Sequence, residues 1–117
     1  MPMESTYLSI QYIKDVAQVS FAKSDLDLHI VQDIQTNLDT LVNDLDQPKV
    51  LIDLTGLNYL PTIALGMLVA ILTKVLRKGG KLRLCGLSPN IRELIAIGQL
   101  DRIFDIYPDL ETGMAKF

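Results

Sequence analysis

A histidine, a cysteine and a carboxylate at a strand end are the side chains of this sequence that could take part in catalysis. His29 is the only histidine. A His-based metal cluster is therefore excluded, and any Ser-His pair would depend on this one residue. Cys85 lies in an apolar stretch, where a thiol more often packs as a small hydrophobic group than acts as a nucleophile. Asp53 ends a predicted strand but has no second carboxylate nearby in sequence with which to form an acid-base pair.

The glycines do not form a nucleotide-binding motif. Gly79 and Gly80 are followed by Lys81-Leu82 and not by the Lys-Ser or Lys-Thr of a phosphate loop, so they are interpreted as a helix stop. Gly56 lacks the glycine spacing of a dinucleotide-binding turn. The sequence therefore carries no enzyme signature, and it predicts no catalytic residue, no metal and no cofactor.

The length, charge and cysteine content restrict the class of protein. The 117 residues fit one domain, 1–117, with residues 1–6 expected to form a flexible N-terminus. A net charge of −3 argues against a nucleic-acid-binding surface. The single cysteine excludes an intramolecular disulfide and, with no signal-like start, favours a cytoplasmic protein. The uncharged run 60–72 has thirteen residues, whereas a membrane span needs roughly 20, so membrane insertion is not expected.

Helices are expected to alternate with strands after an initial hairpin. This order predicts an α/β fold in one domain, with a mostly parallel central sheet, an antiparallel edge hairpin and helices packed on the sheet. The expected strands are 7–13, 15–21, 49–54, 81–87 and 102–107, and the expected helices are 27–45, 62–78, 89–98 and a last one starting at Pro108. The core is expected to include the following leucines: Leu51, Leu54, Leu65, Leu68, Leu72, Leu82, Leu84 and Leu94.

The helix 62–78 has an unusual distribution of apolar residues. At ~100° per residue, one broad face should pack on the sheet, and the opposite face should carry Lys74, Arg77 and Lys78. The inward face comprises Leu65, Leu68, Val69, Leu72, Val75 and Leu76.

The N-terminal half of the outward face of this helix is apolar, with Ile63, Met67 and Ala70. An exposed apolar patch of this kind predicts a protein interface, here rimmed by Asn58, Lys74 and Arg77. The alternative is that a neighbouring loop or the C-terminal helix covers it. The patch permits a homodimer as well as a heterocomplex.

Three sequence blocks resemble one family. They are VLIDLTGLNYL at 50–60, GGKLRLCGLSP at 79–89 and GQLDRIF at 98–104. The chain resembles the STAS domains of bacterial anti-sigma factor antagonists over residues 8–116. The family motif Asp-Ser-Ser-Gly-Leu-Gly corresponds here to residues 61–66, Pro-Thr-Ile-Ala-Leu-Gly. Thr62 takes the position of the phosphoacceptor, Leu65 and Gly66 match, and the other three positions differ.

The resemblance implies a regulatory binding module and not an enzyme. It implies a partner of the histidine-kinase-like ATPase type, an anti-sigma factor that is also a serine/threonine kinase, and a PP2C-type phosphatase that reverses the modification. Thr62 is the candidate phosphoacceptor and is also expected to be the N-cap of its helix. Two alternatives stay open. One is an accessory STAS domain bound constitutively in a transporter or signalling scaffold. The other is a small enzyme or nucleotide binder that uses the crevice at the strand ends.

Overall fold

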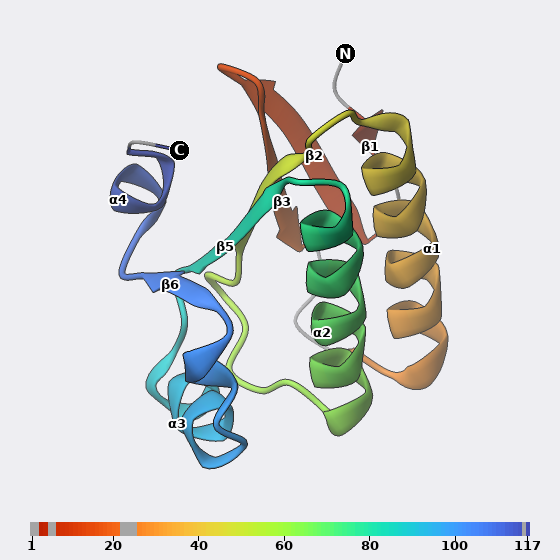
Figure 1. Cartoon of the computed structure of the whole chain (residues 1–117). Coiled ribbons are helices and arrows are strands. Elements are labelled where there is room, and N and C mark those ends of the chain that lie inside the picture. Colours follow the sequence, from red (N-terminus) through yellow and green to blue (C-terminus); the bar gives the residue numbers. More distant parts are fainter. Residues whose placement is uncertain (1–2, 5–6, 22–25, 116) are drawn as a thin grey trace.

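The computed structural model describes residues 3–4, 7–21, 26–115 and 117, and its strands form one sheet (Figure 1). The strands lie in the sheet in the order in which they occur in the chain. Neighbouring strands pair antiparallel from β1 to β3 and parallel from β3 to β6. The strands are β1 Met3–Glu4, β2 Leu8–Ile13, β3 Val16–Phe21, β4 Lys49–Asp53, β5 Lys81–Cys85 and β6 Asp105–Tyr107.

Each parallel connection contains a helix. Because the strand order follows the chain order, the three crossovers run in the same direction, and their helices share one face of the sheet. The helices are α1 Leu28–Asp44, α2 Thr62–Arg77, α3 Pro89–Ile97 and α4 Leu110–Met114, with a short 3₁₀ turn η1 at Leu100–Arg102. Among the described residues, no helix is long and apolar enough to cross a membrane.

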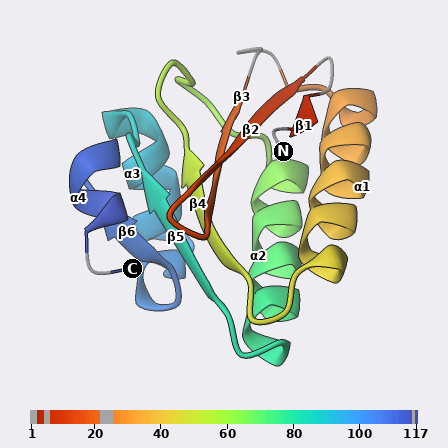
Figure 2. The ribbon, with the colours of Figure 1, turned by 90° about the horizontal axis from the view of Figure 1, so that it is seen from above.

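The larger hydrophobic core lies between the sheet and the three crossover helices. Val50 and Ile52 of β4 and Leu82 and Leu84 of β5 belong to it. Side chains alternate across the sheet, so Leu51 and Cys85 point to the opposite face and form a smaller cluster there. Helix α4 covers that cluster, across the sheet from α1 and α2, which lie side by side (Figure 2).

A buried arginine ties the C-terminal segment to the sheet. Arg83 of β5 donates from Nη1 to the carbonyl oxygens of Gly113 (3.0 Å) and Ala115 (2.8 Å). Its guanidinium also lies over the rings of Tyr107 and Phe117, at 4.8 and 4.4 Å from the ring centroids. These contacts hold the end of the chain against β5 and β6.

The predicted fold class is confirmed, and the differences are local. Met3–Glu4 forms a strand where a flexible N-terminus was expected; residues 1–2 and 5–6 lie outside the described part. The last strand is shorter than predicted because Arg102 ends the 3₁₀ turn. Among the predicted core leucines, Leu65 and Leu94 are only partly buried, and Ile91 and Ile95 provide the buried face of α3 instead.

Candidate functional site

The loop between β4 and α2 brings polar and aromatic groups to the start of α2. Leu57 and Leu60 are buried and anchor this loop to the core. Asn58 and Tyr59, between them, project outward, and Tyr59 is 62% exposed. The loop therefore presents a tyrosine ring directly before the helix that carries Thr62.

Thr62 is the first residue of α2 and is exposed. The prediction that it is the N-cap is wrong by one position: Pro61 occupies the cap, with φ −65° and ψ 157°, and no side chain of the described residues caps the start of this helix. The helix begins at Thr62, at the start expected for the helix 62–78, and the Pro61 carbonyl already accepts from the N–H groups of Ala64 (2.9 Å) and Leu65 (3.2 Å). The Thr62 hydroxyl is therefore not needed to start the helix.

The surroundings of the Thr62 hydroxyl suit a negative charge. The first turn of α2 contains no acidic residue. In the described part of the chain, the backbone N–H groups of Thr62 and Ile63 form no backbone hydrogen bond. Open N–H groups at the positive end of a helix dipole stabilise an anion, so a phosphate here would not be repelled by its own helix.

The expected exposure of Met67 is contradicted: this side chain is 3% exposed. It lies two turns before Lys74, on the flank of α2 that packs against α1. On this flank the Lys74 Nζ is 2.8 Å from Asp39 Oδ1, and the Lys78 Nζ donates to the carbonyls of Val42 and Asn43, both at 2.9 Å. Met67 is buried because α2 packs against α1 as well as against the sheet.

The six predicted interface residues do not form one surface. Asn58 and Ile63, which is 42% exposed, lie near Thr62. Ala70 is partly buried, and Lys74 is held by α1. Arg77 is exposed but lies fifteen residues after Thr62, about 22 Å along the helix at 1.5 Å per residue. At the N-terminal end of α2, a partner can therefore contact only Asn58 and Ile63 of the predicted patch.

The exposed face of α2 is lined by small residues instead. This outward strip consists of Thr62, Gly66, Ala70 and Thr73, of which only Ala70 is partly buried. A Cβ added to Gly66 would have no atom within 4 Å among the described residues, apart from the neighbouring backbone of the helix itself. A glycine inside a helix costs about 1 kcal/mol relative to alanine, and nothing in the described structure requires it here. Gly66 leaves room for the backbone of another molecule to approach the helix.

A groove missed by the sequence analysis adjoins this surface. It has a volume of about 470 Å³ and lies between the loop before α2 and helix α3. Tyr59, Leu94 and Ile97 provide its apolar lining, and Ile97 is 72% exposed. The available signal was the helical period of α3: Ile91 and Ile95 define its buried face, and Ile97 falls outside it. We call Asn58, Tyr59, Thr62, Ile63 and Gly66, with this groove, the α2 entry surface.

Cys85 is buried, and Asp53 is hydrogen-bonded within the turn that follows β4. Burial, followed by the nearby Asp53 carboxylate, raises the pKa of the Cys85 thiol to about 12, so the thiol is protonated at neutral pH. Asp53 Oδ1 accepts from the Thr55 amide (3.0 Å) and hydroxyl (2.6 Å) and shapes the turn after β4. Among the described residues, no group of three or more His, Cys, Asp or Glu side chains could hold a metal ion.

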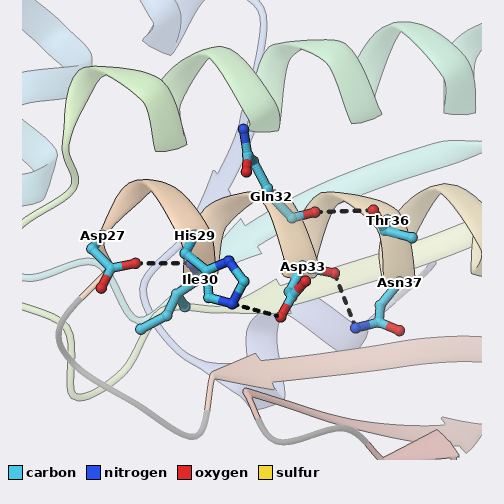
Figure 3. A network of polar contacts seen from close by, with 7 residues as sticks. All are labelled: Asp27, His29, Ile30, Gln32, Asp33, Thr36 and Asn37. Atoms are coloured by element: carbon cyan, nitrogen blue, oxygen red, sulfur yellow. Dashed lines mark hydrogen bonds and ion pairs between the residues drawn. The ribbon is translucent and has the colours of Figure 1, made fainter.

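His29 is an exposed residue on the first turn of α1. Its Nε2 lies 3.9 Å from Asp33 Oδ2, one turn further along the helix (Figure 3). The other polar contacts drawn there are also local to α1: Asp27 caps the helix by accepting from the Ile30 amide, and Thr36 donates to the Gln32 carbonyl. His29 is therefore part of a solvent-facing helix surface.

The comparisons with known proteins identify the family of this chain. The model of the STAS domain family matches residues 7–113. The chain belongs to the STAS domain family. Its similarity to solved STAS-type structures is one of fold, at low sequence identity.

Three solved structures illustrate the similarity. An anti-sigma-factor antagonist (STAS) domain protein from Planctomyces limnophilus is 21% identical, with a TM-score of 0.83 and coverage of 90% of this chain and 92% of that chain. The phosphorylated form of the Bacillus cell fate determinant SpoIIAA is 14% identical, with a TM-score of 0.69 and coverage of 90% and 95%. The murine anion transporter Slc26a9 is 12% identical, with a TM-score of 0.72 and coverage of 86% of this chain but 17% of the transporter.

Proposed function

We propose that this STAS domain is a non-enzymatic regulatory binding module of the cytoplasm. It acts as an anti-sigma factor antagonist and binds an anti-sigma factor that is also a serine/threonine kinase of the histidine-kinase-like ATPase type. The antagonists among the solved structures of the same fold support this role. The α2 entry surface is the proposed contact.

The observation that carries the proposal is the exposed, uncharged start of α2. Thr62, Ile63 and Gly66 are all exposed there, next to the exposed ring of Tyr59. Apolar groups gathered around an open stretch of helix are typical of a protein-binding surface, and Gly66 allows close backbone approach. A partner docked here would cover the Thr62 hydroxyl and bring it to the partner's own active site.

Phosphorylation of Thr62 is the proposed control, and a PP2C-type phosphatase would reverse it. A phosphate adds about −1.5 to −2 charges at pH 7. The open amides at the start of α2 would hold the phosphate locally, so the fold should change little. The new charge would lie beside Ile63 and would have to lose its water on docking, so phosphorylation should release the partner.

The direct test is to incubate the protein with ATP and an anti-sigma factor kinase of the histidine-kinase-like ATPase type from the same organism, and to map the phosphate by mass spectrometry. Phosphate on Thr62 that is absent in Thr62→Ala would support the proposal. Thr73→Ala is the matched control, because Thr73 is an exposed threonine on the same strip of α2. A tight complex without modification would mean that the protein binds its partner constitutively and is not controlled by phosphorylation. Failure to form any complex would contradict the proposal.

The similarity to the anion transporter favours a second candidate function. In that protein a STAS-like fold is a small part of a much longer chain. The present domain could by analogy be an accessory subunit, bound constitutively to a transporter or signalling scaffold and not phosphorylated. Co-purification with a membrane protein whether or not Thr62 is replaced by Glu would favour this candidate.

A further inference from the structure

A second hollow opens at the end of α2 that lies away from Thr62. Its volume is about 330 Å³, and buried Leu72, Leu82 and Phe104 contribute to its lining. Two large aliphatic side chains stand beside it: Leu76, from the last turn of α2, is 58% exposed, and Ile103, from the segment before β6, is 51% exposed. We call this hollow the distal notch.

The distal notch exists because β5 begins before β6. The register pairs Arg83 with Asp105, the first residue of β6. Lys81 and Leu82 pair with β4 on one side, but no described strand pairs with them on the other. The sheet edge is therefore open for two residues, and the segment containing Ile103 lines the space where β6 would otherwise continue.

The rim of the distal notch is positively charged. Lys81 and Arg102 line it, and both are exposed. Neither has an ion pair with any residue that the structure describes. Among the described residues of the lining, Asp105 has the one carboxylate, and its Oδ2 lies 3.7 Å from Nε of Arg83 in β5. On a chain with a net charge of −3, this is a locally cationic site around an apolar floor.

We propose that the distal notch binds an acidic segment of a second protein. One bulky apolar side chain of that segment would fill the hollow between Leu76 and Ile103, and its carboxylates would pair with Lys81 and Arg102. Charge complementarity of this kind selects the partner and its orientation. An anionic membrane fits less well, because recognition of lipid headgroups usually takes four to eight clustered cations, and the remaining surface of this acidic chain would be repelled.

The distal notch and the α2 entry surface can be occupied at the same time. Leu76 lies fourteen residues after Thr62, about 21 Å along α2. A segment docked at the notch could therefore stay bound while the other end of α2 exchanges partners. This raises the effective concentration of a second module carried by the same protein. The notch does not depend on phosphorylation of Thr62, so either proposal can fail without the other.

The probe is a short synthetic peptide in which leucine and phenylalanine are interspersed with aspartate and glutamate. It is titrated into the isotope-labelled chain, and amide chemical shifts are followed by NMR at low and at moderate salt. We expect shifts confined to the residues around Leu76, Lys81, Leu82 and Ile103, weakened by salt. The double variant Lys81→Glu, Arg102→Glu should lower the affinity at least about tenfold. The matched control Arg92→Glu, an exposed cation on α3, should not.

Four outcomes would overturn the proposal. One is equal binding of a peptide in which the acidic residues are replaced by lysine, and another is shifts that spread over the sheet or the α2 entry surface. A third is binding to phosphatidylserine-containing vesicles without binding of the peptide, which would make the notch a membrane contact. The fourth is concentration-dependent self-association that Ile103→Asp abolishes, which would make it a contact between two copies. Urea unfolding of each variant shows whether the fold is intact.

Discussion

Replacing Gly66 by alanine should separate stability from binding. Gly66 lies inside α2, about one turn after Thr62, and an added Cβ would meet no atom of the described residues within 4 Å, so the methyl group causes no steric conflict with them. Alanine is favoured over glycine in a helix interior by about 1 kcal/mol, partly because the unfolded chain loses freedom. We expect the free energy of unfolding to rise by about 0.5–1 kcal/mol and Tm to rise by roughly 2–6 °C.

The same substitution should weaken binding of the anti-sigma factor, because the methyl group occupies the space that the partner's backbone needs. Urea unfolding measures the first effect, and calorimetric titration with the partner measures the second. Gly86→Ala is the control: Gly86 has φ +70°, and its Cβ would come within 2.7 Å of Asp53 Oδ1, so this variant should lose stability. If Gly66→Ala is less stable than the wild type, or equally stable with unchanged affinity, the interpretation of the outward strip is incorrect.

Three further predictions test the burial and protonation of single side chains. Met67→Ala should lower the free energy of unfolding by about 2–5 kcal/mol in urea titrations, whereas Ile63→Ala should change it by no more than about 0.5 kcal/mol. Small changes for both variants would show that Met67 is not buried. The Cys85 thiol, with a pKa of about 12, should not react with a disulfide reagent at pH 8 until the protein is denatured, and fast labelling of the native chain would refute its burial. Asp109 caps α4, and hydrogen bonds from Thr112 lower the pKa of its carboxyl group. The stabilisation by this cap should therefore be complete above the pKa of an unfolded aspartate, and it should be lost as the pH falls through the lowered pKa of the folded state. Hydrogen exchange of the Thr112 amide should then accelerate in acid beyond its intrinsic rate, and Asp109→Asn should remove this extra pH dependence, whereas an unchanged dependence in that variant would assign the effect to another group.

Local signals in the sequence were enough for the order and type of most elements. Lys14 and Asp15 form the tight turn of the hairpin expected from the strands 7–13 and 15–21, both with positive φ (51° and 69°). Ser88 caps α3, and Pro89 follows as its first residue, at the start expected for the helix 89–98 and in keeping with the preference of proline for that position. These features depend on one or two residues and their immediate neighbours, and such signals survive in a single sequence.

The orientation of α2 could not be obtained in this way. Its first twelve residues carry no charge, so several faces are apolar and the period alone does not choose among them. The choice is made by α1, which packs beside α2 and pairs Asp39 with Lys74. The groove around Tyr59 and Ile97 was missed for a similar reason, since it joins a loop and a helix that lie far apart in the sequence.

The contacts of Arg83 also bear on how the chain folds while it is being synthesised. The strands lie in the sheet in the order in which the ribosome makes them, so each new strand can add to the edge of a sheet already formed. Arg83, however, enters the sheet with β5, before the carbonyls of Gly113 and Ala115 exist to receive it. Until then a cation is being drawn into a partly formed core, and Leu51 and Cys85 lack the helix that covers them. We expect ribosome-bound chains that end before residue 113 to have a poorly protected sheet and to bind chaperones. Chains in which residues up to 117 have left the ribosome should no longer bind chaperones.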